Sequence, residues 1–305
     1  MSIRTPILLS AVLATTMFIS ANAYACACGC GIFDVGTGDM LPTHPGGMAW
    51  LEYDFMNQDK NWHNDSKAPA ANNSDKDIKT NFFTAGAEYM FNRAWGAEIE
   101  VPYWSRHFTT DTGGGDIQQF NHSAVGDVRL KGIYSGLSGD MSTGITFGLK
   151  LPTGDHTYAN FDRDTEIGSG STDALLGAYH MGNLTSQFNW FINGELDQPF
   201  LTTAGYRPGS EIDASSGIYY EGWDVGDVRI APVAEVLGSD RMHDRGTNAD
   251  PANSGYRRVL LAPGLEVDAA GFRIYGDVAM PVYQQVKGNQ LTAGELFKLN
   301  ISHSF

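Results

Sequence analysis

The three cysteines of this chain stand in one short run, at Cys26, Cys28 and Cys30. A disulfide between residues two apart closes a strained ring, and an odd number leaves one thiol over, so a conventional disulfide is disfavoured. Closely spaced thiolates instead suit soft metals, which predicts a Cu(I) site, or a Zn(II) site with His44 as a candidate fourth ligand. Lipidation of Cys26, oxidation of the thiols onto a partner, and no function at all remain open alternatives.

A second chemically capable group consists of charged side chains at alternate positions of otherwise apolar segments. Alternation places apolar and charged side chains on opposite faces of a strand, and in a closed barrel the charged face lines the lumen. The predicted lining comprises Glu52, Asp54, Glu88, Glu98, Glu100, Asp127, Arg129, Lys131, Lys150, Glu195, Asp197, Arg229, Glu235, Arg273 and Asp277. Adding Asp213, Glu221, Glu266, Asp268, Arg258 and Lys298 gives fourteen acids against seven bases. Such a lumen favours cations or polar neutral solutes over anions.

The elements that must carry these charges are strands, because the hydrophobic period is two rather than 3.6. The alternation from Phe272 to Val282 is longer than the roughly 5 to 6 residues of a strand in a soluble sheet, and it suits a tilted membrane-crossing strand. About twelve such segments are predicted: 48–56, 81–91, 95–104, 125–135, 142–151, 173–181, 186–197, 211–221, 227–237, 257–268, 271–283 and 295–305. An exported β-sandwich remains the alternative fold.

The connections between these segments alternate in length. Short ones are expected at 92–94, 182–185 and 269–270, and long polar ones at 57–80, 105–124, 152–172, 198–210 and 238–256. This asymmetry predicts an all-β, transmembrane antiparallel barrel of the bacterial outer membrane, with the long loops outside and both ends in the periplasm. Aromatic residues near segment ends are expected to form interfacial girdles in the outer-membrane lipid, namely Trp50, Trp95, Tyr103, Trp190, Tyr220 and Tyr283.

Both ends of the sequence carry targeting signals. Residues 1–25 have the charged, apolar and small-residue layout of a secretory signal peptide. Residues 26–47, rich in Gly and containing the cysteines, are predicted to form a periplasmic arm before a barrel at 48–305. The terminal Phe305 ends an alternating apolar face, which resembles the signal recognised by the barrel assembly machinery.

Composition excludes several classes of protein. The formal net charge is −15, and the 20 Lys and Arg form no block that could neutralise phosphates, so no nucleic-acid partner is expected. No segment after the N-terminus reaches the ~20 apolar residues of a membrane-spanning helix, which excludes a helical-bundle transporter. No catalytic triad order, Walker loop or dinucleotide fingerprint occurs in a suitable setting, so the chain is not expected to be an enzyme.

Several short motifs occur together in a recognisable order. They are Lys150-Leu151-Pro152-Thr153-Gly154-Asp155, Gly168-Ser169-Gly170-Ser171-Thr172-Asp173, Tyr206-Arg207-Pro208-Gly209, Leu261-Ala262-Pro263-Gly264-Leu265, Pro281-Val282-Tyr283-Gln284 and Ser302-His303-Ser304-Phe305. Over residues 125–305 the set resembles the transporter-like outer-membrane family labelled for the MetA pathway of phenol degradation. The resemblance implies a membrane barrel that moves small, often aromatic or apolar, compounds.

The sequence therefore predicts an outer-membrane channel or transporter for small solutes. Two other functions stay open. One is a barrel that binds copper or zinc through its cysteine cluster. The other is a plugged scaffold whose N-terminal arm docks a periplasmic partner.

Overall fold

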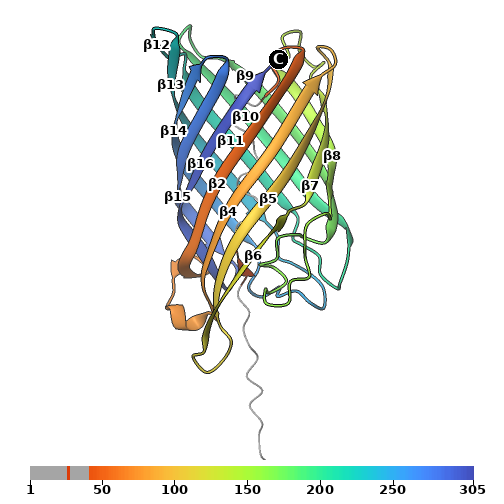
Figure 1. The fold of residues 1–305 in the computed structure, drawn as a ribbon, viewed down its shortest axis with the longest axis vertical. Coiled ribbons are helices and arrows are strands. Elements are labelled where there is room, and N and C mark those ends of the chain that lie inside the picture. The colour runs from red at the N-terminus through yellow and green to blue at the C-terminus, as the bar shows by residue number, and fades with distance from the viewer. Residues whose placement is uncertain (1–25, 28–40) are drawn as a thin grey trace, which may run out of the picture.

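Twelve antiparallel strands close into a barrel in the computed structural model, which describes residues 26–27 and 41–305 (Figure 1). The barrel strands are β2 (Gly46–His63), β4 (Asp75–Met90), β5 (Trp95–Asp111), β7 (Val128–Tyr134), β8 (Thr143–Leu151), β9 (Ser171–Asn183), β10 (Phe188–Thr202), β11 (Glu211–Tyr220), β13 (Val228–Arg241), β14 (Tyr256–Ala269), β15 (Phe272–Val286) and β16 (Asn289–Ser304). Each pairs with the next along the chain, and β16 pairs with β2 to close the ring. The predicted fold is confirmed.

Five shorter elements among the described residues are not part of the ring of twelve strands. They are β1 (Cys26–Ala27), β3 (Ser66–Lys67), β6 (Ile117–Val125), β12 (Trp223–Val225) and the 3₁₀ helix η2 (Ala70–Asn72). Strand β6 pairs with residues 103–111 of β5, and β12 pairs with the first residues of β13. Within the described residues, no helix is long and apolar enough to cross a bilayer.

Side-chain exposure alternates along the barrel strands as the two-residue period requires. On β2, Leu51 is 66% exposed on the outside, whereas Asp54 is 2% exposed on the inside. The same alternation puts Phe83 outside and Phe82 inside on β4. An apolar exterior and a polar interior are the two surfaces of a barrel in lipid.

The observed strands extend beyond the predicted segments at the end that carries the long loops. Strand β2 runs to His63 and β5 to Asp111, whereas the apolar alternation ends near Phe55 and Tyr103. The pleat continues beyond those residues, but its outward side chains, such as Asn57 and Asp59, are polar. The apolar alternation in the sequence therefore marks the membrane-embedded part of a strand and not its full length.

Aromatic pairs lie on the outer surface. Trp95 packs on Tyr134, and Phe188 on Tyr220, near the short turns. Trp50 does not belong to this girdle, so that prediction is wrong. It is 5% exposed and faces the interior, because it is two residues from the inward-facing Glu52.

Candidate functional site in the barrel lumen

One side of the lumen is filled by a central ion-pair cluster from β5, β7, β8, β9 and β10. Its members are Glu98, Glu100, Arg129, Lys131, Lys150, Asp173, Glu195 and Asp197. Lys131 Nζ lies 2.7 Å from Glu98 Oε1, and Arg129 Nη1 lies 2.9 Å from Glu195 Oε1. Lys150 Nζ lies 2.7 Å from Asp197 Oδ2.

Strand register brings these charges together. Lys131 stands directly opposite Glu98, and Lys150 opposite Asp173. Opposed residues of an antiparallel pair have Cβ atoms about 4.5–5.5 Å apart, so oppositely charged neighbours pair across the strands. Because the cluster holds five acids and three bases, it keeps an excess of negative charge.

A smaller Lys298 cluster lies on β16, β2 and β15. Lys298 Nζ is 3.0 Å from Glu52 Oε1 and 3.6 Å from Asp54 Oδ1. Asp277 stands opposite Lys298 on β15, so three carboxylates share one ammonium group. Asn300 Nδ2 donates a hydrogen bond to Glu52 Oε2 at 3.2 Å. This cluster is also acidic in balance.

An aromatic wall separates the two clusters on β2, β4 and β5. It consists of Trp50, Phe82 and Trp104, and the rings of Phe82 and Trp104 meet edge to face with centroids 4.8 Å apart. Gly86 stands opposite Trp50. A Cβ atom at position 86 would lie 2.1 Å from the indole ring, so glycine makes the space for Trp50.

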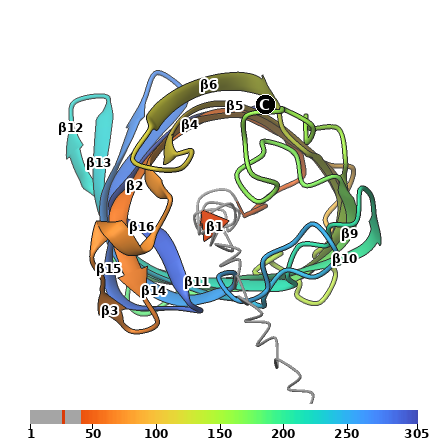
Figure 2. The same ribbon diagram turned by 90° about the horizontal axis from the view of Figure 1, so that it is seen from below.

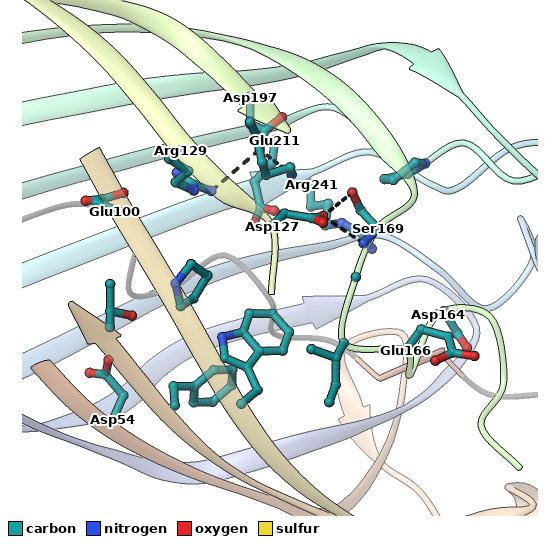
Figure 3. A pocket seen from close by; sticks show the side chains of 18 of the residues that line it. Asp54, Glu100, Asp127, Arg129, Asp164, Glu166, Ser169, Asp197, Glu211 and Arg241 are labelled. Carbon is teal, nitrogen blue, oxygen red and sulfur yellow. Dashed lines mark hydrogen bonds and ion pairs between the residues drawn. The ribbon is translucent and has the colours of Figure 1, made fainter. Parts of the chain in front are cut away.

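A cavity of about 140 Å³ lies between the aromatic wall and the two clusters (Figure 3). Glu52, Asp54, Glu100, Arg129 and Asp197 line its sides. Its outer boundary comes from the segment 152–170, called here the inward loop, because it folds inside the ring of strands (Figure 2). The cavity therefore lies inside the ring of strands, beneath the inward loop.

Asp127 holds both ends of the inward loop. Its Oδ1 accepts a hydrogen bond from the Gly154 amide at 2.9 Å, and its Oδ2 accepts one from the Ser169 amide at 2.8 Å. The Ser169 hydroxyl donates a further bond to Oδ2. Gly154 and Gly168 touch each other, and a Cβ on either would overlap the opposite backbone. The first two sequence motifs therefore form the base of the loop.

The second half of the inward loop is held by Arg106, which is 1% exposed. Its Nη1 donates to the carbonyl oxygens of Thr165 and Glu166, and its Nε donates to Thr80 Oγ1 at 2.9 Å. Burying a guanidinium group costs free energy unless its N–H donors find hydrogen-bond acceptors. The loop carbonyls supply such acceptors, so Arg106 stabilises the inward position of the loop.

Aromatic contacts hold the first half of the loop against β5 and β6. Phe161 packs edge to face on Phe108, with centroids 5.5 Å apart. Tyr158 stacks on His122 at 4.2 Å, and His122 Nε2 lies 2.9 Å from Asp155 Oδ2. The loop is thus packed as well as hydrogen-bonded.

Two carboxyl groups of the inward loop have a raised pKa. Burial raises the pKa of Glu166 to about 8, and the nearby Asp155 adds to the rise. Burial raises the pKa of Asp162 to about 6. Among the described residues, Glu166 Oε2 has no hydrogen-bond partner. The folded loop therefore favours the protonated forms of both groups.

A second buried carboxylate organises the neighbouring loop 203–210. Asp244 Oδ2 accepts a hydrogen bond from the Tyr206 hydroxyl at 2.7 Å, and Oδ1 accepts one from the Gly209 amide at 2.8 Å. Arg241 Nη2 donates to the same Oδ1 at 2.6 Å. Arg163 of the inward loop lies over the Tyr206 ring at 4.3 Å, which joins the two loops.

The remaining predicted lining residues lie closer to the short-turn end or along the wall. Glu88 and Glu235 are buried, and the Tyr275 hydroxyl donates to Glu235 at 3.3 Å. Arg273 pairs with Asp268 at 3.2 Å and is partly exposed. Arg229 is 44% exposed at the rim, where it pairs with Glu221 at 2.7 Å, so the structure does not bring it to the cavity.

The predicted metal ligands are only partly within the described residues. Cys28 and Cys30 lie outside them. The backbone of Cys26 pairs with Gln290 at the start of β16, whereas His44 lies beside Gly46, which is next to Phe305 beyond the end of β16. The structure thus does not bring Cys26 and His44 together. Within the described part of the chain, no group of three His, Cys, Asp or Glu side chains could hold a metal ion.

The terminal Phe305 closes the seam at the short-turn end. Its amide and carbonyl exchange hydrogen bonds with Gly47, each 2.8 Å long. Its ring packs against Gly47, and the residue as a whole is 68% exposed. An assembly signal needs an accessible side chain, and Phe305 has one. Recognition of Phe305 by the barrel assembly machinery stays a prediction. The periplasmic position of the arm also stays a prediction, because residues 28–40 lie outside the described ones.

Sequence reasoning missed Arg106, the inward loop and the aromatic wall. Arg106 lies beyond the apolar part of β5, where only its two-residue spacing from Trp104 and Phe108 marks it as inward-facing. Alternation places Phe82 on the inward face of β4, beside the outward Phe83, but it does not show that Phe82 stands opposite Trp104 on β5.

Solved structures with the same architecture are outer-membrane barrels. The COG4313 outer membrane channel from Pseudomonas putida F1 aligns with a TM-score of 0.66 at 16% identity, over 89% of this chain and 100% of that one. The beta domain of the Bordetella autotransporter BrkA aligns with a TM-score of 0.53 at 12% identity, over 86% and 100%. No protein-family model and no curated protein matches the sequence. At these identities the likeness shows the fold of outer-membrane barrels.

Proposed function

We propose that this protein is an outer-membrane channel for small solutes, with the inward loop as its gate. The observation that carries the proposal is a cavity of about 140 Å³ inside the barrel, lined by charged and aromatic side chains and covered by a tethered loop. A barrel interior that served only to hold the wall together would not need a separate cover. The fold shared with the COG4313 channel supports the same function.

The dimensions and lining of the cavity suit small organic solutes. A cavity of roughly 150 Å³ holds one benzene molecule, and the cavity here is similar in size at about 140 Å³. Its aromatic wall offers a surface for an apolar or aromatic group. This chemistry agrees with the small aromatic or apolar compounds implied by the motif resemblance.

The gate is tested by releasing the loop from Arg106. Arg106→Met keeps a long side chain but removes the donors to the Thr165 and Glu166 carbonyls. Unsatisfied buried acceptors cost about 1–3 kcal/mol each, so the loop should leave the lumen more often. Planar-bilayer recordings of the refolded protein should show a small wild-type conductance and a larger or more frequently open state in Arg106→Met.

A matched control is Arg257→Met, which removes an exposed arginine from the outer surface of β14. It should leave the conductance unchanged. A barrel that is well folded but electrically silent in both the wild type and Arg106→Met would overturn the channel proposal. That outcome would favour the plugged scaffold, because the two ion-pair clusters already occupy much of the lumen.

A further inference from the structure

The carboxylates of the lumen cavity begin where its aromatic wall ends. Trp50, Glu52 and Asp54 follow one another on the inward face of β2, so one strand carries both an aromatic ring and two acids. Phe82 stands opposite Asp54, on β4. An apolar group resting on the wall would therefore place an adjoining polar group beside these carboxylates.

On this side three carboxyl groups share one base. Lys298 is the base paired with Glu52 and Asp54, at 3.0 and 3.6 Å, and Asp277 also faces it. Asp54 is 2% exposed, and among the described residues its Oδ1 has no hydrogen-bond partner, although it is in ionic contact with Lys298. A second cation could thus be accepted at this wall.

The lining as a whole carries a net negative formal charge. Its acids are Glu52, Asp54, Glu100, Asp127, Asp164, Glu166, Asp197 and Glu211, and its bases are Arg129, Lys150, Arg163 and Arg241. Even with Glu166 protonated, acids outnumber bases. An anion entering this cavity is repelled, whereas a cation is attracted.

The aromatic wall already accepts a cation on one face. The guanidinium carbon of Arg106 lies 5.3 Å from the centroid of the Trp104 ring. This distance is within the roughly 6 Å over which a cation is attracted to an aromatic face. The wall is therefore suited to groups that combine positive charge with apolar or aromatic surface.

We propose that the cavity is a binding site for a small organic cation that carries a single aromatic ring. The ring packs on Phe82 and Trp104, and the ammonium group lies beside Asp54 and Glu52. This inference rests on the proposed channel function and specifies the substrate class of the same site. Neutral rings lack the ionic contact, and anions meet like charge.

Three probes of similar size separate the contributions of charge and ring. Benzylammonium is the expected ligand, cyclohexylmethylammonium keeps the charge without the π-system, and benzoate keeps the ring but reverses the charge. Each is added to a bilayer in which the protein conducts potassium, and the concentration that halves the current is measured. Benzylammonium should block at the lowest concentration, about threefold or more below cyclohexylmethylammonium, and benzoate should not block.

Matched substitutions locate the site. Asp54→Asn and Phe82→Leu should each weaken the benzylammonium block severalfold. The controls are Asp59→Asn on the same strand as Asp54, and Phe83→Leu, the outward neighbour of Phe82. Both controls should retain wild-type block. Equal block by the two ammonium probes, or equal loss in the cavity variants and the controls, would overturn the inference.

Binding can also be measured without conductance. Calorimetric titration of the folded barrel in detergent with benzylammonium chloride should show saturable binding that Asp54→Asn weakens. A silent barrel that still binds the probe would contradict the channel and support the site. A conducting barrel with neither block nor binding would support the channel and contradict the site.

Discussion

The Ser169 amide donates a hydrogen bond of 2.8 Å to Asp127 Oδ2, while the other oxygen of Asp127 accepts from Gly154 at the opposite end of the same loop. One buried carboxylate at the start of β7 thus clamps a segment of the chain that covers the lumen. Position 127 was predicted to line the lumen, and its contacts make it the loop's anchor as well.

Replacing Asp127 with Ala should release the base of the inward loop. The change removes the acceptor of three hydrogen bonds and leaves the Gly154 and Ser169 amides without a partner. Each unsatisfied amide costs about 1–3 kcal/mol. Open probability in planar bilayers should rise by about tenfold or more. Asp116→Ala, in the exposed turn before β6, is the control and should behave as wild type.

The gate should open as the pH rises. In the folded loop the pKa of Glu166 is about 8 and that of Asp162 is about 6, both raised by burial. Between their ordinary values and these raised values the closed loop binds protons that the released loop gives up. Raising the pH through this window therefore destabilises the closed state, and acidification stabilises it. Asp155, whose pKa is lowered by hydrogen bonding to Thr157, titrates below the window.

This pH dependence is checked by recording open probability from about pH 5 to about pH 8. It should increase in the wild type, and Glu166→Gln should stay closed over more of the range because its side chain remains neutral. Glu221→Gln, at the opposite rim, should leave the profile unchanged. A wild-type profile that falls with rising pH would contradict the assigned role of the loop carboxyls.

Ion selectivity should depend on the central ion-pair cluster. Replacing both Glu98 and Glu100 with Gln removes two acids and leaves Lys131 with Glu195 at 3.7 Å. The reversal potential under a salt gradient should move away from the cation-selective value toward zero. Glu295→Gln on β16 is the control. Retained heat-modifiable migration in gels would show that the double variant still folds.

The space above Gly86 should be essential for the aromatic wall. Gly86→Leu forces the Trp50 ring to move, since even a Cβ atom would lie 2.1 Å from it. Overpacking typically costs about 1–3 kcal/mol, and the displaced indole should narrow the cavity and lower the conductance. Ala87→Leu, the outward neighbour, should be tolerated in lipid. Equal conductance in Gly86→Leu and the wild type would show that Trp50 does not limit the passage.

The sequence was sufficient to predict the barrel because lipid imposes a simple rule on the outer face. Leu51, Ile99 and Leu299 alternate with charged neighbours, and that pattern is visible without any tertiary information. The rule fails outside the lipid, where the outward side chains of β2 and β5 become polar, and these strand extensions were missed.

Inside the barrel, alternation predicts which residues face inward but not what they contact. Lys131 and Glu98 could be paired only once the β5–β7 register was known. The inward loop was harder still, because its anchors are backbone groups of residues such as Thr165 and Gly154. Their hydrogen bonds carry no side-chain signature. The glycines of two motifs were the visible signal, since each permits a close backbone approach.

The gated channel is tested most directly by the conductance and reversal potential of the refolded protein in a planar bilayer under a potassium chloride gradient. We expect discrete, cation-selective openings that become larger or more frequent when Asp127 is replaced with Ala. Anion-selective openings would contradict the acidic lining. A folded barrel that stays silent with Asp127 replaced would contradict the gated channel itself.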